Sequence, residues 1–215
     1  MTSSRLPNHI SQQFDNELED IRSKVLAMGG LIEQHLAKVL AYFSKGEVEG
    51  VEYVAVSDYL INALEVEIDN DCTDILARRQ PAASDLRLVL AVSKTITDLE
   101  RMGDEAEKIA RLILHEDNVL VAGSYYRGAA TLGKHVALMV RNSLDSFARM
   151  DSEAAFKVAL EDRAIDTETG AIMRQLMTYM MEDPRTISTC LDTILAVRAL
   201  ERIGDHANNI AENVI

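Results

Sequence analysis

Two stretches of the sequence repeat each other and decide the fold: DLERMGDEAEKIA at residues 98–110 and ALERIGDHANNIA at residues 199–211. They align at an offset of 101 residues, and eight of the thirteen positions are identical. Two helix stops with a proline also correspond, RRQPAASDLR at residues 78–87 and MEDPRTISTC at residues 181–190. Self-similarity at a fixed period predicts that one structural unit occurs twice in the chain.

The hydrophobic pattern around these stretches is helical. Apolar residues from Ile10 to Phe43 recur at steps of three and four, which predicts one helix of about nine turns that ends near Lys45 and Gly46. A second helix is predicted at about residues 48–79, and a third ends at about His115 and has Ser84 or Asp85 as its cap. Residues 116–124 are predicted to be a connector. Three more helices are predicted, one from Tyr125 to Phe147, one that starts at Asp151, and one from Asp183 to the end of the sequence. Each unit therefore contains three helices.

Short connections make consecutive helices antiparallel neighbours. We therefore expect an all-α fold of two tandem, pseudo-symmetric three-helix bundles, over residues 1–118 and 119–215. The composition agrees, because three prolines, ten glycines and 47% hydrophobic residues suit long uninterrupted helices. The amphipathic pattern is still present in NIAENVI, which leaves open whether the chain continues past residue 215.

The charge balance limits the partners. There are 22 Lys and Arg residues and 35 Asp and Glu residues, and the resulting net charge of −13 repels nucleic acids and anionic membranes but not metal cations or basic proteins. No segment has the roughly 18 consecutive apolar residues of a membrane span, and MTSSRLPNHISQQF lacks the apolar core of a secretory signal. Cys72 and Cys190 lie far apart, as expected of reduced thiols. We expect a cytoplasmic protein without direct membrane insertion.

Acidic residues form stripes on four of the predicted helices. Glu100, Asp104 and Glu107 are spaced i, i+4, i+7 and so share one helix face. The other stripes are Glu201, Asp205 and Glu212 in the second copy, Asp58, Asn62, Glu65 and Asp69 in residues 48–79, and Asp162 and Asp166 after Asp151. If two such helices are neighbours, their carboxylates and water can hold a hard cation such as Mg²⁺, Mn²⁺ or Ca²⁺, or iron.

A single acidic stripe is more often a solvated face than a binding site. Repetition favours a role here, because both copies keep the order Glu-Arg-x-Gly-Asp and a solvated face needs only charge. Gly103 and Gly204 lie in the middle of predicted helices, where glycine destabilises a helix by about 1 kcal/mol relative to alanine. Glycine at these positions is explained better by close packing of helices than by room for a ligand. Arg78, Arg79 and Arg87 flank the first helix stop and are candidates to bind an anion or a partner's carboxylate, although complementation of the helix dipole explains them equally well.

Common catalytic motifs do not occur in the sequence. A P-loop, G-x-S-x-G and H-E-x-x-H are all missing, and no histidine has a glutamate three residues before it, which disfavours a ferritin-like di-iron site. We therefore expect a protein that is not an enzyme.

The duplicated unit, together with LERMGDEAEKI, LERIGDHANNI, ILARRQPAASDLRLV and LMTYMMEDPRTI, resembles the PhoU family of phosphate-signalling proteins over essentially the whole chain. The resemblance implies a negative regulator of the phosphate-starvation (Pho) response and a modulator of phosphate uptake. It implies an adaptor between the ATPase subunit of a phosphate ABC transporter and a phosphate-sensing histidine kinase. Family members have two three-helix bundles and commonly form homodimers or larger assemblies.

The resemblance also implies that this protein binds a metal, with Mg, Mn, Fe or Zn as the candidates, because some family members bind metal clusters through Glu/Asp-x-x-x-Asp motifs. The matching residues are Glu100 with Asp104, Glu201 with Asp205, Asp58, and Asp162 with Asp166. In the first half Asn62 replaces the counterpart of Asp166, and Lys108 and Arg111 replace the counterparts of Asn209 and Glu212, so we expect weaker binding there. The favoured site consists of Asp162, Asp166, Glu201, Asp205, Asn209 and Glu212.

Two alternatives to a signalling adaptor remain open at this stage. The carboxylate stripes also suit a carboxylate-metal enzyme that acts on phosphate compounds. The other alternative is a helical scaffold whose stripes bind nothing.

Overall fold

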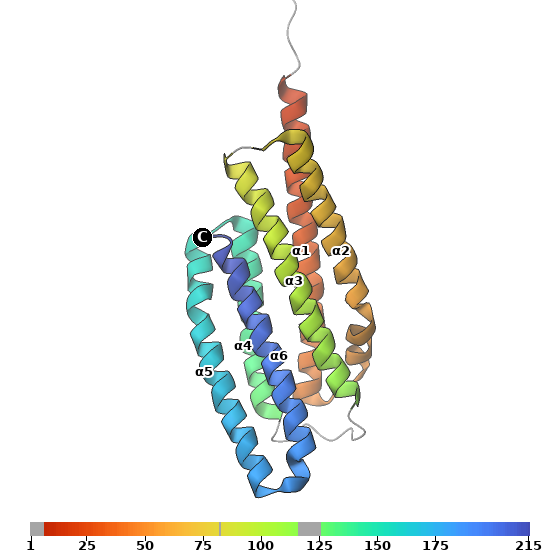
Figure 1. Ribbon diagram of the computed structural model, residues 1–215, viewed down its shortest axis with the longest axis vertical. Coiled ribbons are helices and arrows are strands. Elements are labelled where there is room, and N and C mark those ends of the chain that lie inside the picture. The colour runs from red at the N-terminus through yellow and green to blue at the C-terminus, as the bar shows by residue number, and fades with distance from the viewer. Residues whose placement is uncertain (1–6, 82, 116–125) are drawn as a thin grey trace, which may run out of the picture.

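The computed structural model describes residues 7–81, 83–115 and 126–215, and the regular structure in these ranges is entirely helical (Figure 1). This confirms the predicted all-α class. The helices are α1 (Pro7–Lys45), α2 (Glu49–Arg79), α3 (Ala83–His115), α4 (Tyr126–Arg149), α5 (Ser152–Glu182) and α6 (Ile187–Glu212), with a 3₁₀ turn, η1 (Pro184–Thr186), before α6.

Several helix ends follow from the local sequence. Helix α1 ends at Lys45 because Gly46 adopts a left-handed conformation with φ 74°, and the Gly46 amide donates to the Tyr42 carbonyl at 2.8 Å. Asp151 caps α5 as predicted, since its Oδ1 accepts from the amides of Glu153 at 3.1 Å and Ala154 at 3.0 Å.

Two predicted caps are placed differently by the structure. Helix α3 begins at Ala83, so Ser84 and Asp85 lie inside its first turn and the prediction that one of them is the cap was wrong. The Ser84 hydroxyl donates to the Asp85 carboxylate instead. Asp183 accepts from the Arg185 amide and therefore caps η1, and α6 begins four residues later, at Ile187. The predicted connector at 116–124 lies outside the described residues.

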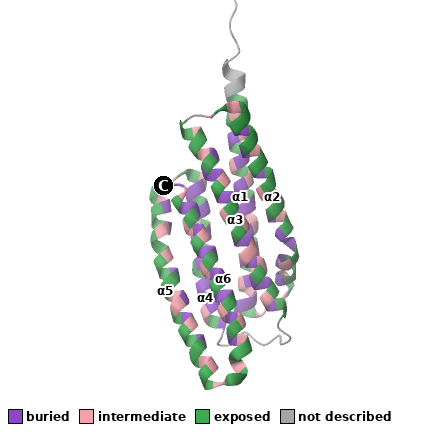
Figure 2. Ribbon diagram, in the orientation of Figure 1, coloured by how far each residue is buried: buried purple, intermediate pink, exposed green. Residues whose placement is uncertain are grey.

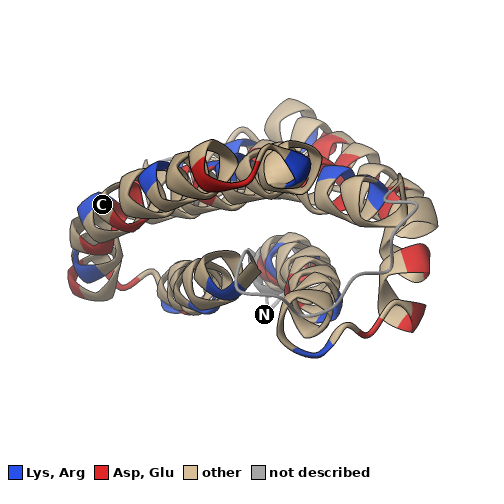
Figure 3. Ribbon diagram, turned by 90° about the horizontal axis from the view of Figure 1, so that it is seen from below, with Lys and Arg blue, Asp and Glu red and all other residues tan. Residues whose placement is uncertain are grey.

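The six helices form two layers (Figure 3). Helices α2, α3, α6 and α5 are neighbours in that order and form a curved layer, and α1 and α4 pack against its inner side. Helix α1 contacts α2 and α3 of its own half, and α4 contacts α5 and α6 of the other half. The halves meet twice, where α1 packs on α4 and where α3 packs on α6. This is the predicted pair of three-helix bundles.

The core runs between the two layers without a break (Figure 2). One face of α1 is fully buried from Ile21 to Val39, in register with the period seen in the sequence, and Leu99 and Leu200 are buried on α3 and α6. Each such side chain contributes about 1.5–3 kcal/mol by leaving water. The predicted boundary between residues 118 and 119 lies outside the described residues and stays a prediction.

Glycines let α1 and α4 approach closely. A Cβ added at Gly133 would overlap Leu40 Cδ2, and one added at Gly29 would lie 2.7 Å from Leu144 Cδ2. A side chain at either position would therefore require the facing leucine to move. In the part of the chain that the structure describes, no helix is long and apolar enough to span a bilayer.

Candidate functional site: two carboxylate clusters

The first cluster lies between α2 and α3. Asp58 is 8% exposed, and its Oδ2 accepts a hydrogen bond from Asn62 Nδ2 at 3.0 Å. Its Oδ1 is buried and has no hydrogen-bond partner among the described residues. Gly103 on α3 makes room for this oxygen, because a Cβ there would lie 2.9 Å from Asp58 Oδ1. An unpaired buried carboxylate oxygen is costly, so Asp58 occupies a position where a cation would be stabilised.

Neighbouring carboxylates surround Asp58. Burial raises the pKa of the Asp58 carboxyl, and the charges of Glu107 and Asp104 raise it further. Burial is the main cause that raises the pKa of Glu100, and the charge of Asp104 raises it further. Burial likewise raises the pKa of Glu65, and the charge of Asp69 adds to it. Such mutual effects require the acids of α2 and α3 to lie near one another, which concentrates negative potential at this surface.

The second cluster repeats this arrangement between α5 and α6. Asp162 Oδ1 is also buried without a hydrogen-bond partner among the described residues. Burial and the charges of Asp166, Asp205 and Glu212 raise the pKa of the Asp162 carboxyl. Burial raises the pKa of Glu201 and of Asp205 as well, with Asp166 contributing to both. Five predicted residues therefore lie in one cluster.

The two clusters differ in their cations. In the first, Arg111 bonds Glu107 at 2.7 Å and Arg101 lies 3.4 Å from Asp104. In the second, Arg198 bonds Glu201 at 2.6 Å, and His206, Arg198 and Arg202 lower the pKa of Asp205. Arg111 also lowers the pKa of Asp58, which confirms that it lies near the first cluster. Arginines therefore partly neutralise both clusters, and the first differs in having Arg111 where the second has Glu212.

The predicted site residue Asn209, and Lys108 at its counterpart in the first half, face elsewhere. Lys108 bonds Glu105 at 3.2 Å, and Asn209 Nδ2 donates to Asp98 Oδ1 at 3.0 Å. Both therefore point to the junction between α3 and α6 and away from the carboxylate clusters. As the side chains stand, no three His, Cys, Asp or Glu residues within 7–81, 83–115 and 126–215 converge closely enough to hold a metal ion.

The junction between α3 and α6 was missed by the sequence analysis. His206 Nδ1 lies 2.9 Å from Asp98 Oδ1, and Arg202 Nη1 donates to Glu105 Oε1 at 2.8 Å. The repeated tract thus carries carboxylates on one face and joins the two halves through another. The spacing of Arg202, His206 and Asn209 at i, i+4, i+7 was the signal that could have revealed this second stripe.

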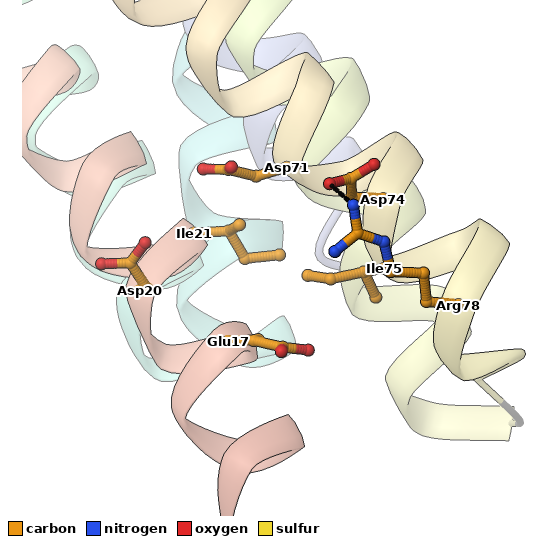
Figure 4. Close-up of a pocket in the computed structure, with 7 residues that line it drawn as sticks. All are labelled: Glu17, Asp20, Ile21, Asp71, Asp74, Ile75 and Arg78. Atoms are coloured by element: carbon orange, nitrogen blue, oxygen red, sulfur yellow. Dashed lines mark ion pairs between the residues drawn. The ribbon is translucent and has the colours of Figure 1, made fainter.

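The candidate arginines at the first helix stop are mostly paired within the chain. Arg79 donates from Nε and Nη2 to the Glu17 carboxylate at 2.9 and 2.6 Å, and Arg78 lies 2.8 Å from Asp74. Arg87 is exposed. The cleft between α1 and α2 beside Arg78 is lined mainly by acidic residues (Figure 4). Arg78 and Arg79 therefore stabilise the end of the first bundle, and of the three candidate arginines only Arg87 has no ion pair among the described residues.

Comparison with known proteins assigns the family. The sequence model of the PhoU domain matches residues 25–113 and 130–214, once in each half. The chain belongs to the PhoU family. A Pseudomonas putida protein named phosphate-specific transport system accessory protein PhoU homolog is 50% identical over 212 residues, covering 98% of this chain and 82% of the relative. The Escherichia coli K12 phosphate-specific transport system accessory protein PhoU is 44% identical over 217 residues, covering 99% of this chain and 88% of the relative.

Solved structures of PhoU proteins share the fold. The crystal structure of PhoU from Pseudomonas aeruginosa superposes with a TM-score of 0.90 at 48% sequence identity and covers 94% of this chain and 97% of its own. The phosphate transport system regulatory protein PhoU from Streptococcus pneumoniae superposes with a TM-score of 0.85 at 28% identity and covers 94% of both chains. The paired three-helix bundles are therefore the PhoU fold.

Proposed function

We propose that this protein is a non-catalytic accessory protein of phosphate transport that also represses the phosphate-starvation response. The observation that carries the proposal is the match over 98–99% of the chain to relatives named as accessory proteins of a phosphate-specific transport system. We propose that it works in the cytoplasm as an adaptor between the transporter's ATPase subunit and a sensor histidine kinase, keeping the kinase silent when phosphate is plentiful. Long helices with exposed outer faces suit an adaptor, because they offer extended surfaces for docking.

Binding to the two partners can be measured directly. The purified protein is immobilised and offered the ATPase subunit and the kinase, in buffers with high and with low phosphate. We expect both partners to be retained in proportion to their concentration, with a difference between the two phosphate levels. Retention of neither partner at either level would contradict the adaptor role. Light scattering on the same sample tests the homodimer that we propose for the free protein.

The clusters support a proposal of metal binding. Asp58 and Asp162 occupy equivalent places in the two halves, and each keeps a buried carboxylate oxygen without a partner among the described residues. In the second half, Asp162, Asp166, Glu201 and Asp205 would hold Mg²⁺, Mn²⁺, Fe or Zn, with Glu212 near them. The side chains must shift to close around an ion, because they do not converge as they stand. A bound cation would neutralise the repulsion that raises their pKa values.

A carboxylate-metal enzyme acting on phosphate compounds is the second candidate function. It is favoured by the raised pKa values of Asp162 and Asp205, since clustered carboxyls of this kind also occur where acids and bases act in catalysis. Incubation of the protein with Mg²⁺, Mn²⁺ or Fe²⁺ and a panel of phosphoesters and anhydrides tests this. Turnover that is lost in Asp205→Ala would establish the enzymatic function. If no compound is turned over, the enzymatic function is excluded and the adaptor role is the function that is left.

A further inference from the structure

A shallow groove runs along the outer side of the α1–α4 pair, on the layer opposite the carboxylate clusters. Its floor is apolar and made of small or partly exposed side chains, chiefly Ala37 and Leu40 from α1 and Ala137 and Leu138 from α4. Leu138 is 55% exposed. The floor is smooth because Gly133 lets Leu40 lie directly against α4.

Cations line the α4 side of this groove. Lys134 and Arg141 line it opposite Glu33 of α1, and Arg127, seven residues before Lys134, continues their stripe beyond the groove over about 21 Å of helix in all. No ion pair within the described residues includes Arg127 or Lys134, and Arg141 has only Glu33 at 3.8 Å. Many of the protein's other cations are held in ion pairs, as with Lys24, which lies 2.7 Å from Asp71. Because Lys134 is unpaired among the described residues and Arg141 is only loosely paired, two cations border an apolar floor here, and this combination suits an acidic partner.

We propose that the α1–α4 groove binds an acidic amphipathic helix of a partner protein. A furrow between two antiparallel helices accepts a third helix whose apolar ridge lies on the floor, and acidic side chains spaced by seven residues would then reach Lys134 and Arg141. The proposal goes beyond the adaptor role, because it assigns a surface and a partner chemistry that the match to relatives does not give.

Two other occupants fit less well. An anionic membrane is flat and would touch the ridges of α1 and α4 more than the furrow between them, and the net charge of the whole chain repels it. A second copy joined symmetrically through this face would bring the same α4 cations of both copies together. The helix of a partner avoids both penalties.

Photocrosslinking in cells tests the proposal on the full chain. The photoreactive amino acid p-benzoylphenylalanine replaces Ala137, and the same amino acid in place of the exposed Lys157 on α5 serves as the control position. The crosslinked peptide is identified by mass spectrometry. We expect a segment of another protein with helical apolar spacing and acidic residues. We expect the crosslink to be lost with Lys134→Glu combined with Arg141→Glu, and to persist with Lys157→Glu combined with Arg174→Glu, which changes the charge equally on α5.

Circular dichroism spectra and melting temperatures of the two double variants must match the unmodified protein, so that loss of the crosslink reports on binding. A crosslink to this chain itself would overturn the proposal and assign the groove to a homo-oligomer. A crosslinked segment without acidic residues, or no crosslink above the control position, would also overturn it. Flotation with phosphatidylglycerol vesicles that is lost in the groove double variant would assign the surface to a membrane instead.

Discussion

Asp58 and Gly103 fit together across the α2–α3 interface: a Cβ at position 103 would lie 2.9 Å from Asp58 Oδ1 and 2.9 Å from Ile61 Cδ1. The equivalent glycine in the other half, Gly204, is less tightly enclosed, since its added Cβ would lie 3.4 Å from the nearest atom, Ile165 Cγ2. The same position in the repeat is therefore packed more closely in the first half than in the second.

Gly103→Ala should destabilise the protein, whereas Gly204→Ala should not. Alanine gains about 1 kcal/mol of helix propensity at either position, but at 103 it must displace Asp58 and Ile61, so we expect a net loss of about 1–2 kcal/mol there. Urea unfolding followed by circular dichroism measures both variants. Equal unfolding free energies for the two would show that the close approach at Gly103 does not matter.

Asp58→Asn should stabilise the metal-free protein at neutral pH. Because the folded state raises the pKa of Asp58, stability from this group is fully present below the ordinary aspartate pKa and is lost as pH rises through the raised value. The asparagine keeps the acceptor for Asn62 without the charge, so we expect a gain of about 1 kcal/mol at pH 7 that shrinks below about pH 4.

Asp183→Asn is the control, because it should destabilise the protein at neutral pH where Asp58→Asn should stabilise it. Its hydrogen bonds to Arg185 lower the pKa of Asp183, so this carboxylate adds stability above the ordinary aspartate pKa and loses it in acid. Unfolding in urea with a chelator at pH 4 to 7 compares the two variants. A destabilised Asp58→Asn at pH 7 would mean that its charge is compensated in the folded protein.

Asp205→Ala and Asp104→Ala should differ in their effect on metal binding. They occupy equivalent positions, but the first cluster has Asn62 where the second has Asp166, and Arg111 where it has Glu212. We expect Asp205→Ala to weaken Mn²⁺ binding by more than about tenfold in calorimetric titration, and Asp104→Ala to change the strongest binding little. The reverse order would place the stronger site in the first half, and no heat from the unmodified protein would remove the metal proposal.

Glu105 and Arg202 should couple the two halves weakly. Their ion pair joins α3 to α6, with Arg202 largely exposed, so a double-mutant cycle with Glu105→Gln and Arg202→Gln should give about 0.5 kcal/mol that diminishes in high salt. The exposed pair of Lys157 and Glu153 within α5 is the comparison and should give less. A coupling that is insensitive to salt would indicate packing between the side chains and not charge.

Much of the fold could be predicted because the signals are local. The helix ends at Gly46 and Asp151 and the duplicated unit follow from periodicity, glycine and capping chemistry. The carboxylate clusters were predictable too, since antiparallel neighbours bring Asp58 to Gly103 and Asp162 to Asp205. What could not be predicted depends on contacts between halves. Asn209 shares a helix with Glu201, yet its side chain bonds Asp98 because α3 lies beside α6. The spacing of residues on one helix gives the direction of a side chain around the helix axis, but it does not show which helix lies on that side.

The proposed repressor role is tested by measuring a phosphate-starvation reporter in cells that lack the chain and in the same cells with the chain restored, both grown in high phosphate. We expect strong reporter expression without the chain and repression when it returns. Equal, low reporter expression in both strains would contradict the proposal that this protein restrains the phosphate-starvation response.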